Sequence, residues 1–436
     1  MNNQYKVTPM LPSGINTEEK IINLFKNILL NDLIIDINSP AEKDRFRMVF
    51  RHCQTWAIED GSIEVSHITT SESHGYGMMI LAFMAEYEDK LNPNPLKRVY
   101  GCGIHDYFDA MLRTVLEFPS VMGKNNRLFA WELFGYPADG ENKTGYREIN
   151  GIKSAPFTRD PQSGDCATDG DMDIIYSLLL ADKLWGSCGK YDYKKTALDM
   201  LDCLWDYCVH KKFFTLLLGD WASGGKGTLS SAVRISDIIP AHLKVFAEAD
   251  KKHDWKKVLD ATYNVIFDLC ESKNHQNGLL PDFAVWNNGK WKAPLKTILE
   301  GDDGAYSYNA CRVPWRLGSD YLLFGDSILS GDDTQAKSLY KMIIKPLDEF
   351  AKNYINDDID RLGPFNLDGS PLGDRDPETF TSPFLVTAAA NQTDKEWINK
   401  IWSWKGLDEY SGDNYSDYIK LLSMLTASGK IFLPRM

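Results

Sequence analysis

One acidic residue, Glu72, stands in the stretch SESHGYGMMILAF among hydroxyl, glycine, histidine and tyrosine residues, directly before an apolar run. Gly75 and Gly77 allow close approach of a backbone or a ligand. A carboxyl group at such a boundary is partly desolvated, so it can keep its proton near neutral pH and act as a general acid. The alternative is an ordinary surface acid at a helix N-terminus, with Ser71 or Ser73 as the N-cap.

A second group of acids opens another apolar segment, CATDGDMDIIYSLLLADKLWG, in which Asp169, Asp171 and Asp173 lie just before and within the first turn of an expected helix. One aspartate can cap the helix, and its neighbours can complement the positive end of the helix dipole. Three acids in five residues exceed what capping requires, because their mutual repulsion raises their pKa values or demands donors nearby. We therefore expect that one of them faces a cleft.

A third group, Glu300, Asp302 and Asp303, lies in the glycine-punctuated loop KTILEGDDGAYSYNACRVPWRLG, before a helix that begins near Arg312. These acids lack the spacing of an EF-hand calcium loop. A solvated turn is one interpretation. The other is a second catalytic carboxylate, which would complement Glu72.

Two tryptophans lie in expected loops or helix ends, Trp131 in RLFAWELFG and Trp221 in LGDWASGG, and no core pattern surrounds Trp221. Burial in the core is the alternative for each of them. Sugar rings present flat apolar CH faces, and an indole face is a natural platform for such a ring. Separated carboxylates together with aromatic platforms are what a glycoside hydrolase requires.

The elements that must position these residues are mostly helices of ten to fifteen residues, separated by Gly-, Asp-, Asn- and Pro-rich connectors. In LDCLWDYC, the residues Leu201, Leu204, Trp205 and Cys208 recur at the spacing of one helix face. Comparable patterns predict about eleven or twelve helices, over residues 19–32, 75–88, 104–117, 171–186, 238–250, 255–271, 312–324, 333–352, 382–391, 395–403 and 415–427.

Strand alternation is scarce and no repeat of fixed period is visible, so the pattern disfavours a solenoid. The apolar segment MDIIYSLLLADKLW is typical of an inner helix in a closed helical barrel. The connectors 140–165, 220–236 and 285–305 are too long for simple turns and are expected to form a functional rim. We predict an all-α fold with a single domain over residues 1–436.

Composition narrows the classes of ligand. The formal net charge of −13 argues against duplex nucleic acid or an anionic membrane as a partner, because both would repel the protein. No apolar run is long enough to span a membrane. The start of the chain lacks a basic region followed by an apolar one, so we expect a cytoplasmic protein if Met1 is native and a secreted one if a leader precedes it.

Metal and cofactor chemistry is not expected. The eight histidines form no metal-binding motif. The cysteines form no C-x-x-C pair and are expected to be mostly buried free thiols; they are Cys53, Cys102, Cys166, Cys188, Cys203, Cys208, Cys270 and Cys311. We expect a monomer that needs no cofactor.

On these motifs, the chain resembles glycoside hydrolase family 8. ATDGDMDIIYSLLLADKLW is similar to the family signature A-[ST]-D-[AG]-D followed by an apolar helix, with Ile175 in place of an alanine. SESHGYGMM resembles the family segment S-E-G-x-x-Y-G-M, with Ser73 in place of the usual glycine. LFAW, LGDW, GLLPDF, LEG and YNACRVPWR align in order, so the resemblance covers roughly residues 45 to 430.

The resemblance implies an (α/α)6 barrel with an open cleft and an inverting hydrolase of β-1,4-linked glycans. Glu72 would be the general acid, and Asp169 would hold the sugar at the point of cleavage. Many members carry the base as the aspartate of Y-D-A-x-R, where this chain has Asn309. A subgroup that resembles bacterial chitosanases has the same Asn and takes its base from an inserted loop, at a position that Glu300 matches. Asp302 and Asp303 remain alternatives.

The resemblance also suggests that Trp131, Trp221, Asn309 and Arg312 bind substrate. We predict an endo-acting enzyme on oligo- or polysaccharides with chitosan as the favoured substrate, because an acidic cleft would attract glucosamine ammonium groups. The alternatives are a β-1,4- or mixed-linkage β-glucanase or a xylanase of the same family. A different alternative is a glycan-binding protein without catalytic activity.

Overall fold

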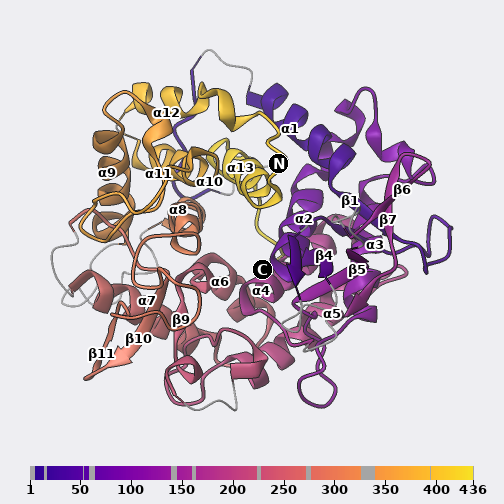
Figure 1. The fold of residues 1–436 in the computed structure, drawn as a ribbon, viewed down its shortest axis with the longest axis horizontal. Coiled ribbons are helices and arrows are strands. Elements are labelled where there is room, and N and C mark those ends of the chain that lie inside the picture. Colours follow the sequence, from indigo (N-terminus) through magenta and orange to yellow (C-terminus); the bar gives the residue numbers. More distant parts are fainter. Residues whose placement is uncertain are drawn as a thin grey trace.

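Six helices form a closed ring at the centre of the molecule (Figure 1). In the computed structural model, which describes residues 5–13, 17–52, 54–57, 64–138, 145–159, 164–222, 227–271, 276–325, 339–392 and 394–435, each of these helices contacts the next one and the last contacts the first. In order around the ring they are α2 (Ser71–Met84), α4 (Thr168–Trp185), α6 (Pro240–Ala249), α8 (Val313–Phe324), α11 (Ser382–Asn391) and α13 (Asn414–Ala427).

A second layer of helices surrounds the ring, and each outer helix packs on at least one inner helix. Its members are α1 (Thr17–Asn31), α3 (Ile104–Glu117), α5 (Tyr193–Cys203), α7 (Trp255–Glu271), α9 (Lys345–Ile355) and α12 (Lys395–Trp402). The inner helix α11 is buried along its whole length, whereas the outer helix α3 buries one face, as the inner and outer positions of a helical barrel require. A short helix, α10 (Pro377–Phe380), precedes α11.

The predicted helices are found, with shifted ends. Helix α2 begins four residues before the predicted start at residue 75, because its glycines lie inside the helix instead of before it. A Cβ atom at Gly77 would lie 2.4 Å from the Phe50 ring, so the glycine is required by packing. Helix α5 was predicted only through the stretch 201–208, which ends in a π-helical turn at Leu204–Cys208. Residues 326–338, which include the start of the predicted helix 333–352, lie outside the described residues.

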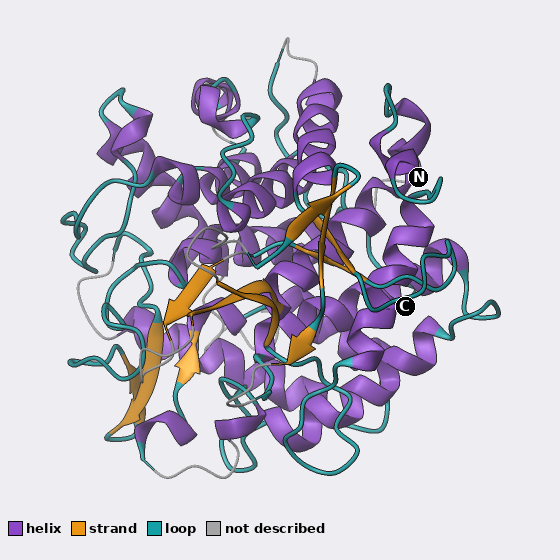
Figure 2. Ribbon diagram, turned by 45° about the vertical axis from the view of Figure 1, so that its right-hand side comes forward, coloured by secondary structure: helices purple, strands orange, loops and turns teal. Residues whose placement is uncertain are grey.

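The all-α prediction is only partly right, because the described residues include eleven strands in three small sheets (Figure 2). The strands are two to seven residues long, too short for a reliable alternating pattern. Their orders are β2-β1-β7-β6, β3-β4-β5-β8 and β11-β10-β9. The bounds are β1 (Leu33–Asp36), β2 (Met48–Phe50), β3 (Gln54–Ala57), β4 (Glu64–Thr70), β5 (Glu132–Ala138), β6 (Arg147–Ile149), β7 (Ile152–Ala155), β8 (Thr158–Arg159), β9 (Val233–Arg234), β10 (Phe283–Asn287) and β11 (Lys290–Lys292).

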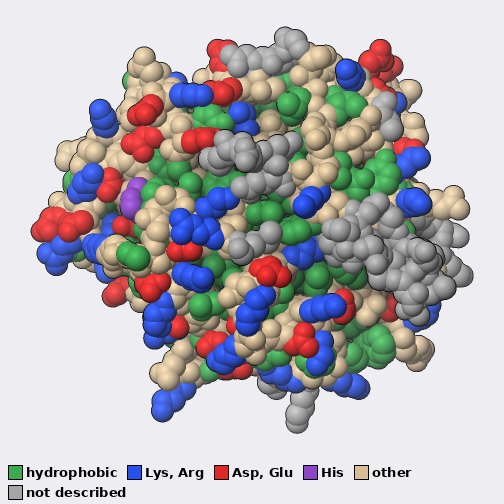
Figure 3. Space-filling model, turned by 180° about the vertical axis from the view of Figure 1, so that it is seen from behind, with side chains coloured by type: hydrophobic (Ala, Val, Ile, Leu, Met, Phe, Trp, Pro, Cys, Tyr) green, Lys and Arg blue, Asp and Glu red, His purple; other side chains and the backbone are tan. Residues whose placement is uncertain are grey.

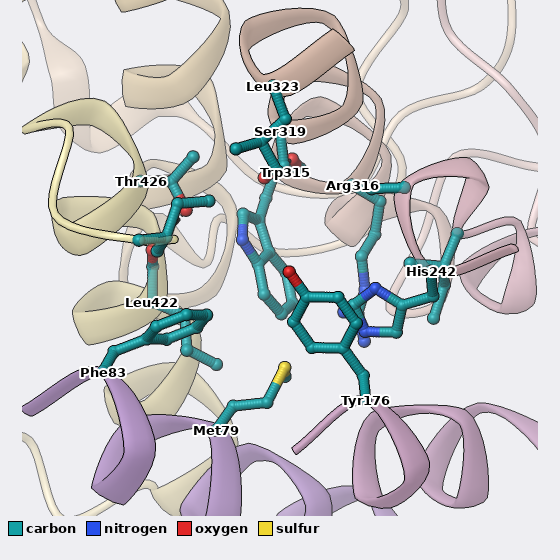
Figure 4. A pocket seen from close by; sticks show the side chains of 13 residues that line it. Met79, Phe83, Tyr176, His242, Trp315, Arg316, Ser319, Leu323, Leu422 and Thr426 are labelled. Carbon is teal, nitrogen blue, oxygen red and sulfur yellow. Dashed lines mark hydrogen bonds between the residues drawn. The ribbon is translucent and has the colours of Figure 1, made fainter. Parts of the chain in front are cut away.

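The interior of the ring holds a small cavity of about 30 Å³ (Figure 4), and a buried ion pair between Arg316 and Asp173 lies beside it. Side chains of α2, α4, α6, α8 and α13 line this cavity, among them Tyr176, His242 and Arg316. Arg316 donates two hydrogen bonds to Asp173, at 2.9 and 2.5 Å, and His242 Nε2 lies 2.9 Å from the same carboxylate. Although burial acts to raise the pKa of Asp173, Arg316 and His242 hold it below its ordinary value. The cavity has room for water but not for a sugar ring.

The surface carries both signs of charge. On the face opposite to that of Figure 1, acidic and basic side chains are interspersed without a continuous patch of one sign (Figure 3). Of the seven cysteines whose surroundings are described, five are buried, and all seven are free thiols; Cys53 lies outside the described residues. Among the described helices, none is long and apolar enough to cross a membrane.

Candidate active site

Residues singled out from the sequence gather at the N-terminal ends of the inner helices. Glu72 lies in the first turn of α2, Asp169 lies in the first turn of α4, and Asn309 and Arg312 directly precede α8. Chain segments more than two hundred residues apart therefore meet at one rim of the barrel. The positive ends of several helix dipoles converge on this rim, which favours a cluster of carboxyl groups there.

Glu72 combines partial access to solvent with a low-dielectric surrounding. It is the one residue of α2 that is half-buried instead of buried. The N-cap is Thr70, whose hydroxyl accepts from the Ser73 amide, so the predicted caps Ser71 and Ser73 were both wrong. Burial, followed by the negative charge of Asp169, raises the pKa of Glu72 to about 7, against the opposing effect of Arg234 and Arg312. Glu72 can therefore hold a transferable proton near neutral pH.

Asp169 is buried and paired with an arginine. Its Oδ2 atom accepts a hydrogen bond of 2.9 Å from Arg312 Nη1, which also lies 3.0 Å from the Tyr76 hydroxyl. The remaining guanidinium nitrogens of Arg312 bind Asn309, through Nη2 to Oδ1 at 3.0 Å and Nε to the carbonyl oxygen. Arg312 thus links the start of α4 to the segment before α8.

The other two acids of this group do not face the rim. Asp171 accepts a hydrogen bond of 2.7 Å from the Phe129 amide, and burial, with the charges of Asp220 and Asp169, raises its pKa well above the ordinary value. Asp173 belongs to the ion pair inside the ring. None of the three caps α4, because the N-cap is Ala167. Of the three acids, Asp169 is therefore the one that lies at the rim, beside Glu72.

Glu300 is the most accessible acid of the cluster, with 43% of its side chain exposed. Its Oε1 atom accepts from Arg234 Nη2 at 2.8 Å, and its Oε2 atom accepts from Asn309 Nδ2 at 2.6 Å. Asn309 is itself fixed, because its backbone amide and side chain donate to the buried Asp282. The carboxylate of Glu300 is therefore oriented from two sides while remaining open to solvent.

The alternatives to Glu300 differ from it in position. Asp303 is buried, and its carboxylate accepts from three successive backbone amides, those of Ile298, Leu299 and Glu300, at 2.5 to 3.0 Å. It is therefore occupied in shaping the loop that carries Glu300. Asp302 is exposed on the same loop, and no described side chain orients it.

The two tryptophans border this region in different ways. Trp131 is 38% exposed, and its carbonyl oxygen accepts a 2.7 Å hydrogen bond from the Ser71 amide, one residue before Glu72. Trp221 is half-buried against a small cluster of Leu218, Ala232 and Phe283. It therefore has a local core that the sequence did not indicate. Trp131 offers more free ring surface to a ligand.

Sequence reasoning missed two charged residues, Arg234 and Asp237, in the predicted rim segment 220–236 and directly after it. Arg234 ends strand β9, and the positive charge of its guanidinium acts on Glu72 as well as on Glu300. Asp237 is buried, and burial, with the negative charge of Asp169, raises its pKa well above the ordinary value. No periodicity marks them; their only sequence signal is a pair of opposite charges, in VRISD, within a long loop.

The charges of this cluster balance. Arg312 pairs with Asp169, and Arg234 pairs with Glu300. Among the described residues, neither Glu72 nor Asp237 forms an ion pair. Two carboxylates are thus matched by cations, and the two other carboxyl groups have raised pKa values. An acid with a raised pKa beside a solvent-accessible carboxylate that pairs with a cation meets the requirements of acid–base hydrolysis.

Close contact of α2 with α4 sets the position of Glu72 relative to Asp169. A Cβ atom at Gly170 would lie 2.3 Å from Ser71 Oγ and 2.5 Å from its carbonyl carbon. We expect that Gly170→Ala pushes the two helix starts apart and lowers kcat by about 10- to 100-fold. We expect a loss of about 1–3 kcal/mol in the free energy of unfolding. Rates and denaturant titrations of this variant, beside Gly189→Ala at an open loop position, test this. Equal activity of the two variants would contradict it.

Comparisons with known proteins identify the family. The model of glycosyl hydrolases family 8 matches residues 151–346. A β-glucanase of Niallia circulans is 34% identical over 362 residues, which cover 83% of this chain and 76% of the relative. An endoglucanase of Bacillus sp. (strain KSM-330) is 30% identical over 366 residues, which cover 84% of this chain and 68% of the relative.

Solved structures agree with this. The apo structure of a β-1,3-1,4-glucanase from Paenibacillus sp.X4 superimposes with a TM-score of 0.77 at 28% identity and covers 98% of this chain and 97% of that chain. The sequence relatives, the helical ring and the carboxyl groups at its rim lead to the same conclusion. The protein is an enzyme, a glycoside hydrolase, and the chain belongs to glycoside hydrolase family 8.

Proposed function

We propose that the protein is an inverting endo-β-glucanase in which Glu72 is the general acid and Glu300 is the general base. The observation that carries this proposal is that the guanidinium of Arg234 pairs with Glu300 while its positive charge also acts on Glu72. Glu72 has a pKa of about 7, and Glu300 is held open to solvent by Arg234 and Asn309. Asp169 is assigned to hold the sugar at the point of cleavage.

The reaction follows from these roles. Glu72 gives its proton to the glycosidic oxygen as the bond from that oxygen to the anomeric carbon breaks. Glu300 takes a proton from a water molecule, whose oxygen forms the new bond on the opposite face of the sugar ring. An inverting enzyme keeps its two carboxyl groups about 6.5–9.5 Å apart to admit this water. Asn309 stands where an aspartate base would stand, and it cannot accept a proton at neutral pH, so the base comes from the loop before it.

We propose a neutral β-1,4- or mixed-linkage glucan as the substrate in place of chitosan. The preference for chitosan depended on a net negative cleft, but Arg234 and Arg312 balance two of its carboxylates, so the local attraction for an ammonium group is weak. The relatives cited above are a β-glucanase and an endoglucanase, and the superimposed structure is a β-1,3-1,4-glucanase. The idea of a glycan-binding protein without catalytic activity has no support in these comparisons.

A substrate panel tests the proposal. We expect that one preparation releases reducing sugar from lichenan and carboxymethylated cellulose at least about 10-fold faster than from chitosan, because Arg234 and Arg312 already pair with Glu300 and Asp169 and so weaken the attraction for an ammonium group. Proton NMR of the first products should show the α-anomer, as single displacement requires. Fastest cleavage of chitosan would contradict the substrate proposal, and an initial β-anomer would contradict the mechanism.

A further inference from the structure

The side chain of Arg234 is held rigidly beside the proposed base Glu300. This side chain is 12% exposed, and its guanidinium lies over the Phe283 ring, 5.5 Å from the ring centroid. Phe283 is also the residue that Arg234 faces across strands β9 and β10. The stem of the side chain is thus held by a sheet, and its head donates to Glu300 Oε1 at 2.8 Å. Such a rigid cation can define the position of a partner carboxylate.

The same guanidinium also faces carboxyl groups from three other elements. Asp237 lies on the turn before α6, Asp169 on α4 and Glu72 on α2, and the negative charge of each acts on Arg234. Glu72 in turn is faced by Asp169, Arg234 and Arg312, and Glu300 is faced by Arg234 and the neutral Asn309. The charge of Arg234 thus interacts with both Glu72 and Glu300.

We propose that Arg234 is a positioning residue that fixes the carboxylate of Glu300 for attack by water and whose positive charge also acts on the general acid Glu72. The inference depends on the roles of Glu72 and Glu300 proposed above. Without the guanidinium, Glu300 keeps only its bond to Asn309 and can rotate away at the tip of an exposed loop. Without the positive charge, the ionised form of Glu72 is less stable, so its pKa rises.

Two substitutions separate position from charge. Arg234→Gln removes the cation, and we expect kcat to fall by about 10- to 100-fold with a much smaller change in KM, because the ground-state sugar contacts remain. We also expect the alkaline limb of its pH–rate profile to move to higher pH. Arg234→Lys keeps a charge without the fixed fork, so it should lose turnover but keep the alkaline limb at the wild-type pH. Arg45→Gln, on an exposed ion pair, is the matched control.

The readouts distinguish the possible failures. Near-ultraviolet circular dichroism and thermal unfolding first establish that each variant is folded. An Arg234→Gln enzyme with wild-type kcat, or with lowered kcat and an unmoved alkaline limb, would overturn the inference, since loss of structure alone does not move the limb. If Glu72→Gln or Glu300→Ala keeps full activity, the proposed function fails instead, whatever Arg234 does.

Discussion

Glu72→Gln is expected to lower kcat on lichenan by about 10²- to 10⁴-fold, the range over which a positioned general acid contributes. The amide preserves the shape of the side chain but has no proton to transfer to the leaving oxygen. Affinity for a cello-oligosaccharide, measured by calorimetry, should stay close to the wild-type value, because the substitution removes an interaction made in the transition state. A wild-type kcat in Glu72→Gln would show that Glu72 is not the general acid.

The pH dependence of the wild-type enzyme also tests the assignment of Glu72 as the general acid. Burial and the charge of Asp169 raise the pKa of Glu72 to about 7, so the acid is protonated below this pH and ionised above it. We expect kcat/KM to fall as the pH rises through about 7, because only the protonated form can donate. The fall in rate at alkaline pH should be absent from the residual activity of Glu72→Gln. If another acid causes this fall, it will persist in Glu72→Gln, which would contradict the assignment.

Helical periodicity predicted the barrel well because packing repeats along each helix. Apolar residues must recur at every turn that faces the core, so the pattern of an inner helix is visible over ten or more residues of sequence. Residues that act once leave no such trace. The helix start at Ser71 was misjudged because Gly75 reads as a helix breaker, while the structure places its missing Cβ 2.8 Å from Asp173 Cβ, where only a glycine allows α2 to approach α4.

The candidate site was predictable where chemistry and position coincide in a motif, as for Glu72, Asp169 and Glu300. Arg234 was not, because its importance comes from a two-residue strand that pairs with Phe283, a contact across 49 residues of chain that no local pattern encodes. The same residue explains why net charge misleads about the substrate. A charge of −13 is a property of the whole chain, whereas the cluster of carboxyl groups at the rim contains its own cations, Arg234 and Arg312.

Glu300→Ala is expected to lower kcat by about 10²- to 10⁴-fold, because Glu300 is oriented by Arg234 and Asn309 while it stays open to the attacking water. By contrast, Asp303 on its loop is buried, and Asp302 is not oriented by a described side chain. The matched control is Asp302→Ala on the same loop, which should keep nearly full activity because that side chain is exposed and unoriented. Loss of activity in Asp302→Ala, with an active Glu300→Ala, would assign the base to Asp302.

Asp303→Ala is also expected to have a lowered kcat, but for a different reason. Its carboxylate accepts from the amides of Ile298, Leu299 and Glu300, so its removal frees the loop that presents the base.

An added small anion distinguishes loss of the base from displacement of the loop that carries it. Azide can occupy the space left in Glu300→Ala and attack the anomeric carbon itself, so turnover should be partly restored and a glycosyl azide formed. In Asp303→Ala the Glu300 carboxylate is still present but misplaced, so azide should restore nothing. Rescue of Asp303→Ala with none in Glu300→Ala would identify Asp303 as the base, because only a missing reactive group, and not a displaced loop, can be replaced by a small anion.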